Sequence, residues 1–248
     1  MATAPRSSQV RDATAIIKAR HRTQVRRRLI RVIVPAAVVL LGVAAVWAVW
    51  FSPLFSTKSV QVTGNSQASV EQIIEAAQVP IGTPLARVDT AAIKDRVKQV
   101  PVVADASVSR DLNGVIEISV TERVAVYTIS VSSQYLLVDS TGTGFLTVPS
   151  APDSLPMVKL TVDDSEQSQR LMVDAATIIA ALPDSVRASM TVMSAETPDT
   201  FTIDLANGAQ ILWGSAEESD LKAQVIDGLL NVDAHYYDVS SPSHPATR

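Results

Sequence analysis

Residues 103–120, VADASVSRDLNGVIEISV, carry the pattern that decides the fold of the first folded region. Apolar side chains alternate with polar ones in both arms of this stretch, at Ala104, Ala106 and Val108 and again at Ile116, Ile118 and Val120. A period of two predicts half-buried strands. Asn113-Gly114 lies between the arms and is expected to supply the positive φ angles of a tight turn, so the stretch is predicted to be a β-hairpin.

One strand and two short helices are predicted before the hairpin. Residues 58–63 alternate as in a short strand. Ser69 stands three residues before Gln72 in a capping-box arrangement, and the apolar face of the helix that follows comprises Val70, Ile73, Ile74 and Ala77. Asp89 can cap a second helix, whose inner positions are Ala92 or Ile93, Val97 and Val100. Residues 55–122 are therefore expected to form a β-α-α-β-β module of the α+β class.

A second mixed β domain with two helices is predicted over residues 123–240. Its expected strands are residues 124–129, 135–138, 190–194, 201–205, 209–213 and 236–240. The inner face of its long helix comprises Leu171, Ala175, Ile178, Ile179 and Leu182. The inner face of its last helix comprises Leu221, Val225, Gly228 and Leu229. Residues 241–248, rich in Ser and Pro, are expected to be a flexible tail.

An uncharged stretch of 20 residues, Val32 to Phe51, precedes both regions. As a helix it measures roughly 30 Å, the thickness of the hydrocarbon core of a bilayer. The apolar core of a cleaved secretory signal has only about 7–15 residues, so an uncleaved transmembrane helix is favoured. Trp47 and Trp50 lie at its outer end, where aromatic rings favour the headgroup region.

Charge is distributed unevenly about this stretch. Residues 1–51 hold nine Lys or Arg and one acid, a net charge of +8, which leaves 12 basic and 24 acidic groups, a net of −12, in the remaining 197 residues. The positive-inside rule then places residues 1–31 in the cytoplasm and the large acidic part outside the plasma membrane. The basic tail has no aromatic residue for base stacking, so anionic lipid, and not nucleic acid, is its expected partner.

Residues that could perform catalysis are sparse. The chain has no Cys and only three His, and neither His235 nor His244 stands in a serine-hydrolase motif or at metal-ligand spacing. The glycine pair of residues 139–144 is not followed by the Lys-Ser/Thr of a phosphate loop, which favours a hairpin turn. No catalytic residue, cofactor or metal is therefore expected, and the sequence favours a protein that binds other proteins.

The last predicted strand offers a means of binding. No further strand is expected after residues 236–240, so this strand is predicted to lie at a sheet edge with Tyr237 and Val239 on one face. An edge strand exposes unpaired N–H and C=O groups, to which a partner segment can add as a further strand.

Several stretches together resemble the FtsQ/DivIB family of cell-division proteins. In order, they are VQVTGN (60–65), PVVADASVSR (101–110), IEISVTER (116–123), LVDSTGTGF (137–145) and DVSSP (238–242). The first three are similar to the family's POTRA domain, and the resemblance covers nearly all of residues 52–245. The family usually carries an aromatic-Pro pair where this chain has Asp111-Leu112.

The resemblance implies a single-span scaffold at the division septum, without enzymatic activity, that recruits and regulates septal peptidoglycan synthesis. It implies FtsB-like and FtsL-like partners and other membrane proteins of the division machinery. By position, the residues that dock the FtsB-like partner are Tyr236, Tyr237, Asp238, Val239, Ser240 and Ser241.

Two other functions remain open from the sequence. An anchored POTRA protein of secretion or envelope assembly usually carries POTRA repeats before a barrel, and no second copy of the pattern of residues 55–122 is found here. An extracytoplasmic cell-wall hydrolase is the third reading, for which the chain offers no recognisable catalytic motif.

Overall fold

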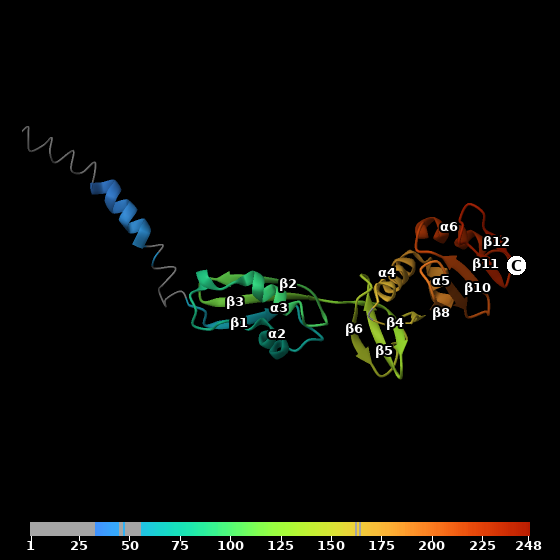
Figure 1. The fold of residues 1–248 in the computed structure, drawn as a ribbon, viewed down its shortest axis with the longest axis horizontal. Coiled ribbons are helices and arrows are strands. Elements are labelled where there is room, and N and C mark those ends of the chain that lie inside the picture. Colours follow the sequence, from blue (N-terminus) through green and yellow to red (C-terminus); the bar gives the residue numbers. More distant parts are fainter. Residues whose placement is uncertain (1–32, 45–46, 48–55, 162, 164) are drawn as a thin grey trace, which may run out of the picture. The chain divides into compact units, whose positions relative to one another are not determined.

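The computed structural model describes residues 33–44, 47, 56–161, 163 and 165–248 of the chain. In this part of the chain, the strands form a small three-stranded sheet followed by a large nine-stranded sheet, and helices accompany both (Figure 1). The α+β class predicted from the sequence is confirmed.

Residues 33–44 and Trp47 are helical, and their side chains are exposed. The predicted limits of the transmembrane helix, Val32 and Phe51, and its outer Trp50 lie outside the described residues, as does the basic tail. Among the residues that are described, no helix combines the length and the apolar character needed to cross a bilayer.

The three-stranded sheet has the order β1-β3-β2. Its strands are β1 (Ser59–Thr63), β2 (Val103–Asp111) and β3 (Val115–Glu122). Two helices, α2 (Val70–Ala77) and α3 (Thr90–Val97), and the short 3₁₀ helix η2 (Leu85–Arg87) connect β1 to β2. The helices and strands bury Ile73, Ala77, Ile93, Val97, Ile116 and Ile118. The predicted β-α-α-β-β order is therefore present.

The capping box of α2 is confirmed, but its buried face is narrower than predicted. The Ser69 hydroxyl accepts from the N–H of Gln72, and the Gln72 side chain accepts from the N–H of Ser69. Val70 and Ile74 are each more than one third exposed. Val70 and Ile74 lie four residues apart on one side of the helix, next to the side formed by the buried Ile73 and Ala77. Only the side with Ile73 and Ala77 is buried.

The turn of the hairpin differs from the prediction. Among the described residues around it, Gly114 has a positive φ, +95°, but Asn113 does not. The Asp111 carboxylate instead accepts from the N–H of Asn113 at 3.0 Å, and the Gly114 N–H donates to the Asp111 carbonyl at 3.0 Å. Glycine is required at 114 because a Cβ there would lie 2.7 Å from the carbonyl oxygen of Ser56.

Glu122, at the end of β3, fixes the loop before α2. Its carboxylate accepts from the backbone N–H groups of Ser66, Gln67 and Ala68 at 2.9–3.0 Å. Burial raises the pKa of Glu122, but these three donors outweigh burial and hold it below its ordinary value. The end of the hairpin is thereby tied to the start of a helix more than 50 residues earlier.

The nine-stranded sheet has the order β12-β11-β10-β9-β8-β7-β4-β5-β6. Its first strands in the chain are β4 (Ala125–Val131), β5 (Gln134–Asp139), β6 (Gly144–Val148) and β7 (Met157–Lys159). They are followed by β8 (Met190–Ser194), β9 (Phe201–Leu205), β10 (Gln210–Gly214), β11 (Tyr236–Asp238) and β12 (Ala246–Thr247). The strand β6 follows the glycine turn of residues 139–144, so the predicted hairpin turn is confirmed.

Three helices pack on one face of this sheet, although the sequence predicted two. They are α4 (Glu166–Ala181), α5 (Asp184–Ser189) and α6 (Ser219–Leu229). Leu171, Val186 and Ile226, one from each helix, share a core with alternate strand residues such as Ile203 and Ile211. All five predicted inner positions, four within α4 and Leu182 directly after it, are buried.

The inner face of α6 was predicted correctly only in part: Val225 and Leu229 pack against the core, but the other two predicted positions do not. Leu221 is 44% exposed and Gly228 is exposed, whereas Lys222 and Ile226 are buried. The helix is thus rotated by about one residue from the predicted orientation. Leu221 was predicted to be buried because leucine is apolar, but the neighbouring Lys222 is buried in its place.

The predicted position of the last strand was also wrong in one respect. Residues 236–238 form β11 as expected, yet β11 is not the edge of the sheet because β12 pairs with it on the outer side. Residues 246–247, part of the predicted flexible tail, are this outer strand. The terminal segment (residues 241–248) therefore returns to the sheet that it leaves.

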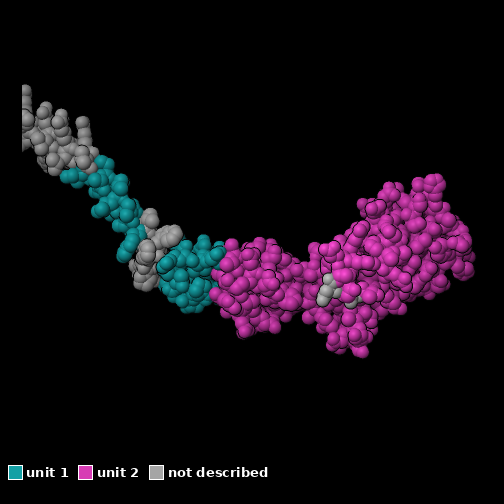
Figure 2. Space-filling view, in the orientation of Figure 1, with its two compact units in different colours: residues 1–61, 79–90, 109–117 teal, residues 62–78, 91–108, 118–248 magenta. Residues whose placement is uncertain are grey.

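The chain divides into two compact units (Figure 2). One comprises residues 1–61, 79–90 and 109–117, and the other comprises residues 62–78, 91–108 and 118–248. The second unit contains the whole nine-stranded sheet, its helices and the final residues of β3.

Candidate partner-docking site

The inner side of β11 is joined to β10 as a parallel pair. Gln210 is in register with Tyr236, and Leu212 is in register with Asp238. The Val239 N–H donates to the carbonyl of Leu212 at 3.0 Å, and the Gln210 N–H donates to the carbonyl of His235 at 2.9 Å. Parallel neighbours require a crossover connection, which α6 supplies here.

The outer side of β11 faces β12, with which it pairs in antiparallel fashion. Tyr236 and Arg248 exchange two backbone hydrogen bonds, of 3.0 and 2.9 Å. Tyr237 is opposite Thr247, and Asp238 is opposite Ala246. Because backbone groups alternate in direction along a strand, the N–H and C=O groups of Tyr236 and Asp238 point away from β10.

The side chains of the predicted docking residues fall into two sets. Tyr237 and Val239 are buried, and the Tyr237 hydroxyl donates to the carbonyl of Val232 at 2.7 Å. Tyr236 and Asp238 are half-buried on the opposite face. Ser240 and Ser241 are exposed after the strand ends. The predicted alternation is confirmed, and only Tyr236 and Asp238 combine partly exposed side chains with outward backbone groups.

The Asp238 side chain shapes the chain where it leaves β11. Its carboxylate accepts from the Ser240 N–H at 3.0 Å and from the Ser240 hydroxyl at 2.7 Å. Ser240 lies over Gly214 at the end of β10, where a Cβ would come within 2.9 Å of the serine Cβ. The close approach, together with a φ of +77°, explains the glycine at this position.

Buried polar groups support β10 and α6 from within the core. The Trp213 indole N–H donates to the Ser219 hydroxyl at 3.1 Å, and the Lys222 ammonium donates to the carbonyl of Ser215 at 2.8 Å. Burial lowers the pKa of Lys222, and the negative charges of Glu218, Glu217 and Asp199 oppose that shift. Lys222 therefore holds the turn between β10 and α6.

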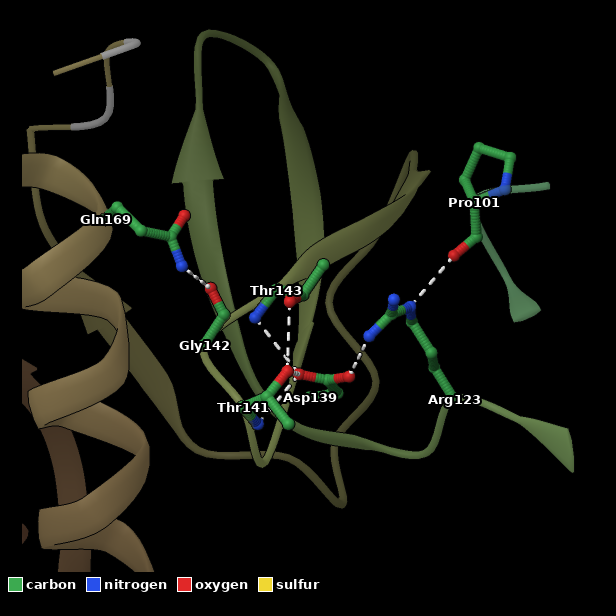
Figure 3. A network of polar contacts seen from close by, with 7 residues as sticks. All are labelled: Pro101, Arg123, Asp139, Thr141, Gly142, Thr143 and Gln169. Carbon is green, nitrogen blue, oxygen red and sulfur yellow. Dashed lines mark hydrogen bonds and ion pairs between the residues drawn. The ribbon is translucent and has the colours of Figure 1, made fainter. Parts of the chain in front are cut away.

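A charged network lies at the opposite end of the sheet, at the turn between β5 and β6 (Figure 3). Arg123 Nη1 and Asp139 Oδ2 are 2.5 Å apart, and Arg123 Nε donates to the carbonyl of Pro101 at 3.1 Å. The other carboxylate oxygen of Asp139 accepts from the N–H and hydroxyl of Thr141 and from the N–H of Thr143. Gln169 of α4 donates to the carbonyl of Gly142 at 3.2 Å.

Asp139 is almost fully buried in this network. Burial raises the pKa of its carboxyl group, but donation from Thr141, Thr143 and Arg123 prevails and lowers the pKa below its ordinary value. The residue pair was not singled out by sequence reasoning, although both residues lie within stretches that carry the family resemblance. The available signal was a charged residue at the end of each of two strands, Arg123 after β3 and Asp139 as the last residue of β5.

No catalytic arrangement is evident in the described part of the chain. None of its groups of His, Asp and Glu is arranged to hold a metal ion. A hollow of about 670 Å³ is lined mainly by hydroxyl residues, among them Ser194, Thr197, Thr200 and Thr202. These hydroxyls bond to one another, Ser194 with Thr202 at 3.0 Å and Thr197 with Thr200 at 3.1 Å. The hollow contains none of the predicted docking residues.

Two family models match successive parts of the chain. Residues 55–123 match the POTRA domain of FtsQ type, and residues 127–240 match the C-terminal domain of cell division protein FtsQ/DivIB. These matches cover both regions whose motifs carry the resemblance.

Individual relatives match over most of the chain. Cell division protein FtsQ of Streptomyces bingchenggensis is 33% identical over 237 residues, which cover 92% of this chain and 89% of the relative. FtsQ of Streptomyces coelicolor is 30% identical over 257 residues, covering 99% of this chain and 97% of the relative.

One solved structure is similar at a low level. It is the major extracytoplasmic domain of the trans isomer of DivIB from Geobacillus stearothermophilus, with a TM-score of 0.33 and 14% identity over 40% of this chain and 85% of that chain. This likeness is too weak to support a conclusion about the fold. The two family models and the relatives that match over most of the chain show that the chain belongs to the FtsQ/DivIB family of bacterial cell-division proteins.

Proposed function

We propose that this protein is a non-enzymatic, single-span scaffold that recruits and regulates septal peptidoglycan synthesis through protein contacts. Residues 1–31 lie in the cytoplasm, residues 32–51 cross the plasma membrane, and the acidic remainder lies outside at the division septum. The partners are FtsB-like and FtsL-like membrane proteins, and the FtsB-like partner docks on residues 236–241. The charge asymmetry about residues 32–51 and the membership in a division family support this proposal.

The single observation that carries the docking proposal is the direction of the backbone groups of β11. The inner groups are taken up by β10, while those of Tyr236 and Asp238 point outward to a strand of only two residues. A partner segment that pairs with these outward groups extends the sheet by backbone hydrogen bonds, and side-chain contacts then provide specificity.

A matched pair of proline variants tests this assignment. Proline removes one backbone donor. Asp238→Pro removes a donor that faces away from β10, so co-purification of the full chain with the FtsB-like partner should fall at least tenfold while thermal unfolding changes little. Val239→Pro removes the donor to Leu212 inside the sheet and should lower the unfolding temperature of the protein itself.

The Asp238→Ala variant is the control, because it loses the carboxylate contacts to Ser240 but keeps the backbone donor. It should retain most of the partner binding. Unchanged co-purification of the Asp238→Pro variant would refute docking on β11.

Localisation tests the division role independently. A fluorescent fusion of the full chain should form bands at midcell in dividing cells. Loss of these bands on removing residues 236–248, with the rest of the protein still folded by protease resistance, is the expected result. A uniform envelope signal from the intact protein would contradict the division role.

A further inference from the structure

The strand β12 is attached to the sheet much more weakly than β11. It has two residues, both exposed, whereas Tyr237 of β11 and Val239 directly after it are buried in the core. Besides the strand pairing, its connection rests on backbone bonds between Arg248 and both His235 and Tyr236. An element with few buried contacts and exposed hydrogen bonds opens at a low free-energy cost, without unfolding of the rest.

The segment before β12 favours its return after opening. Residues 239–245 connect the two strands and contain Pro242 and Pro245, which restrict the conformations of the open chain. The His244 N–H also donates to the carbonyl of Ser241 at 2.9 Å, forming a turn. A short, restricted connection keeps β12 near the outer side of β11, so that it competes with any strand that binds there.

Arg248 adds a side-chain contact to this pairing. Its guanidinium carbon lies 5.0 Å from the centre of the Tyr236 ring, within the range of a cation–π interaction. Tyr236 is thus contacted by both the backbone and the cation of the same residue. The strand that occupies this place is antiparallel to β11, has small uncharged side chains opposite Tyr237 and Asp238, and ends in a cation over Tyr236.

We propose that β12 is an internal substitute for a partner strand, and that a partner binds β11 by displacing it. The partner is a protein segment in extended conformation that runs antiparallel to β11 and places an Arg or Lys over Tyr236. This inference rests on the proposed docking function and specifies how the site is occupied before and after binding. The net charge of −12 on residues 52–248 also favours a basic segment over an acidic one.

Displacement makes the affinity for the partner depend on the opening of β12. When only the open form binds, the apparent dissociation constant equals the intrinsic one divided by the open fraction. A change that increases the open fraction of β12 therefore raises the affinity for the partner by the factor by which the open fraction grows. Removal of β12 raises the affinity to its intrinsic value.

A reversible lock tests displacement directly. Asp238 and Ala246 are paired across the two strands, and such pairs have Cα atoms about 5.5 Å apart, a separation that a disulfide can bridge. The natural chain has no Cys, so the double variant Asp238→Cys/Ala246→Cys can form no other disulfide within the chain. Oxidation of the full-length variant in detergent micelles should reduce binding of the FtsB-like partner at least tenfold, and reduction should restore it.

Single variants, Asp238→Cys and Ala246→Cys, control for the substitutions themselves and should bind equally in both redox states. If the oxidised double variant binds the partner as tightly as the reduced one, displacement is refuted while docking near β11 is retained. If neither redox state nor the natural chain binds, the proposed docking function itself has failed.

Hydrogen exchange gives a second measurement that requires no partner. The Tyr236 amide, bonded to Arg248, should exchange at least tenfold faster than the Val239 amide, bonded to Leu212 in β10. Equal exchange at both amides would show that β12 opens only with the sheet and would refute displacement. The protection factor at Tyr236 should also match, within about threefold, the gain in partner affinity on removing residues 243–248.

The cation is tested by Arg248→Ala and Arg248→Lys. A cation–π contact of about 0.5–1 kcal/mol corresponds to a factor of about two to five, so the Ala variant should bind the partner two to five times more tightly because its β12 closes less well. The Lys variant should resemble the natural chain. Weaker binding by the Ala variant would contradict competition between Arg248 and the partner.

Discussion

The two edges of the nine-stranded sheet are held in different ways. A charged network lies at the β6 edge, whereas the β12 edge consists of a strand of two exposed residues. Near β6, Asp139 is buried, paired with Arg123 and bonded to the turn that begins β6. At the other end, β12 contributes no buried side chain and is held by backbone pairing and one cation over Tyr236. The difference indicates that the β6 end resists change, whereas the β12 end can exchange its outer strand.

The largest expected effect is at the charged end. Asp139→Ala leaves Arg123 without its carboxylate partner and removes the acceptor of the Thr141 and Thr143 donors. Breaking a buried pair in this way should cost roughly 2–4 kcal/mol of unfolding free energy. Urea denaturation of the full chain, followed by tryptophan fluorescence, measures it because Trp213 is buried in the same core. A loss below about 0.5 kcal/mol would remove the contrast between the two ends.

Acidification should weaken the same end. The pKa of Asp139 is lower in the folded chain than its ordinary value of about 4, so the folded state binds fewer protons and its stabilisation is complete above that pH. The stabilisation is lost as the pH falls from about 4 through the folded-state pKa. Asp139→Asn should therefore lose less stability than the natural chain between pH 5 and pH 2. Parallel pH profiles for the two proteins would contradict this.

The inner attachment of β11 should give an intermediate effect. Tyr237→Phe removes the hydroxyl that donates to the Val232 carbonyl but keeps the buried ring. A net loss of about 1 kcal/mol is expected, typical of one hydrogen bond. Tyr236→Phe is the matched control at the neighbouring position and keeps the ring face for Arg248, so its stability should be unchanged. Equal losses in both variants would contradict the distinction between the two faces of β11.

The smallest effect on global stability is expected at β12. Arg248→Ala should change the free energy of unfolding by less than about 0.5 kcal/mol, because β12 opens before the sheet unfolds. In the free protein, the change should be visible as faster hydrogen exchange at Tyr236. A loss comparable to that of Asp139→Ala would mean that both ends of the sheet are equally integral to the fold.

The sequence predicted those helices and strands that are long enough for their pattern of apolar residues to repeat several times. Apolar residues alternate with polar ones in both hairpin arms, which form β2 and β3, and the inner face of α4 recurs over about three turns. The structure confirms both. In contrast, β7 has three residues and β12 has two, which is too short for any period to be recognised.

The errors at the candidate site have a related cause. Lys222 was not placed inside because a lysine is ordinarily exposed, and its burial depends on the carbonyl of Ser215, seven residues earlier. The position of β11 beside β10 was not deducible, since parallel neighbours are related through a crossover and not through a turn. The strand at residues 236–238 was predicted from the alternation of Tyr237 and Val239, but the strand that covers it was not.

The parallel pairing of β10 and β11 has a consequence for biosynthesis. As the chain emerges from the ribosome, residues 236–238 can reach β10 only when α6 crosses back over the sheet, so β11 joins the sheet after β10 and α6 have been made. Nascent or prematurely ended copies lack this strand altogether. Docking on β11, as proposed above, therefore requires chains that extend through both α6 and β11.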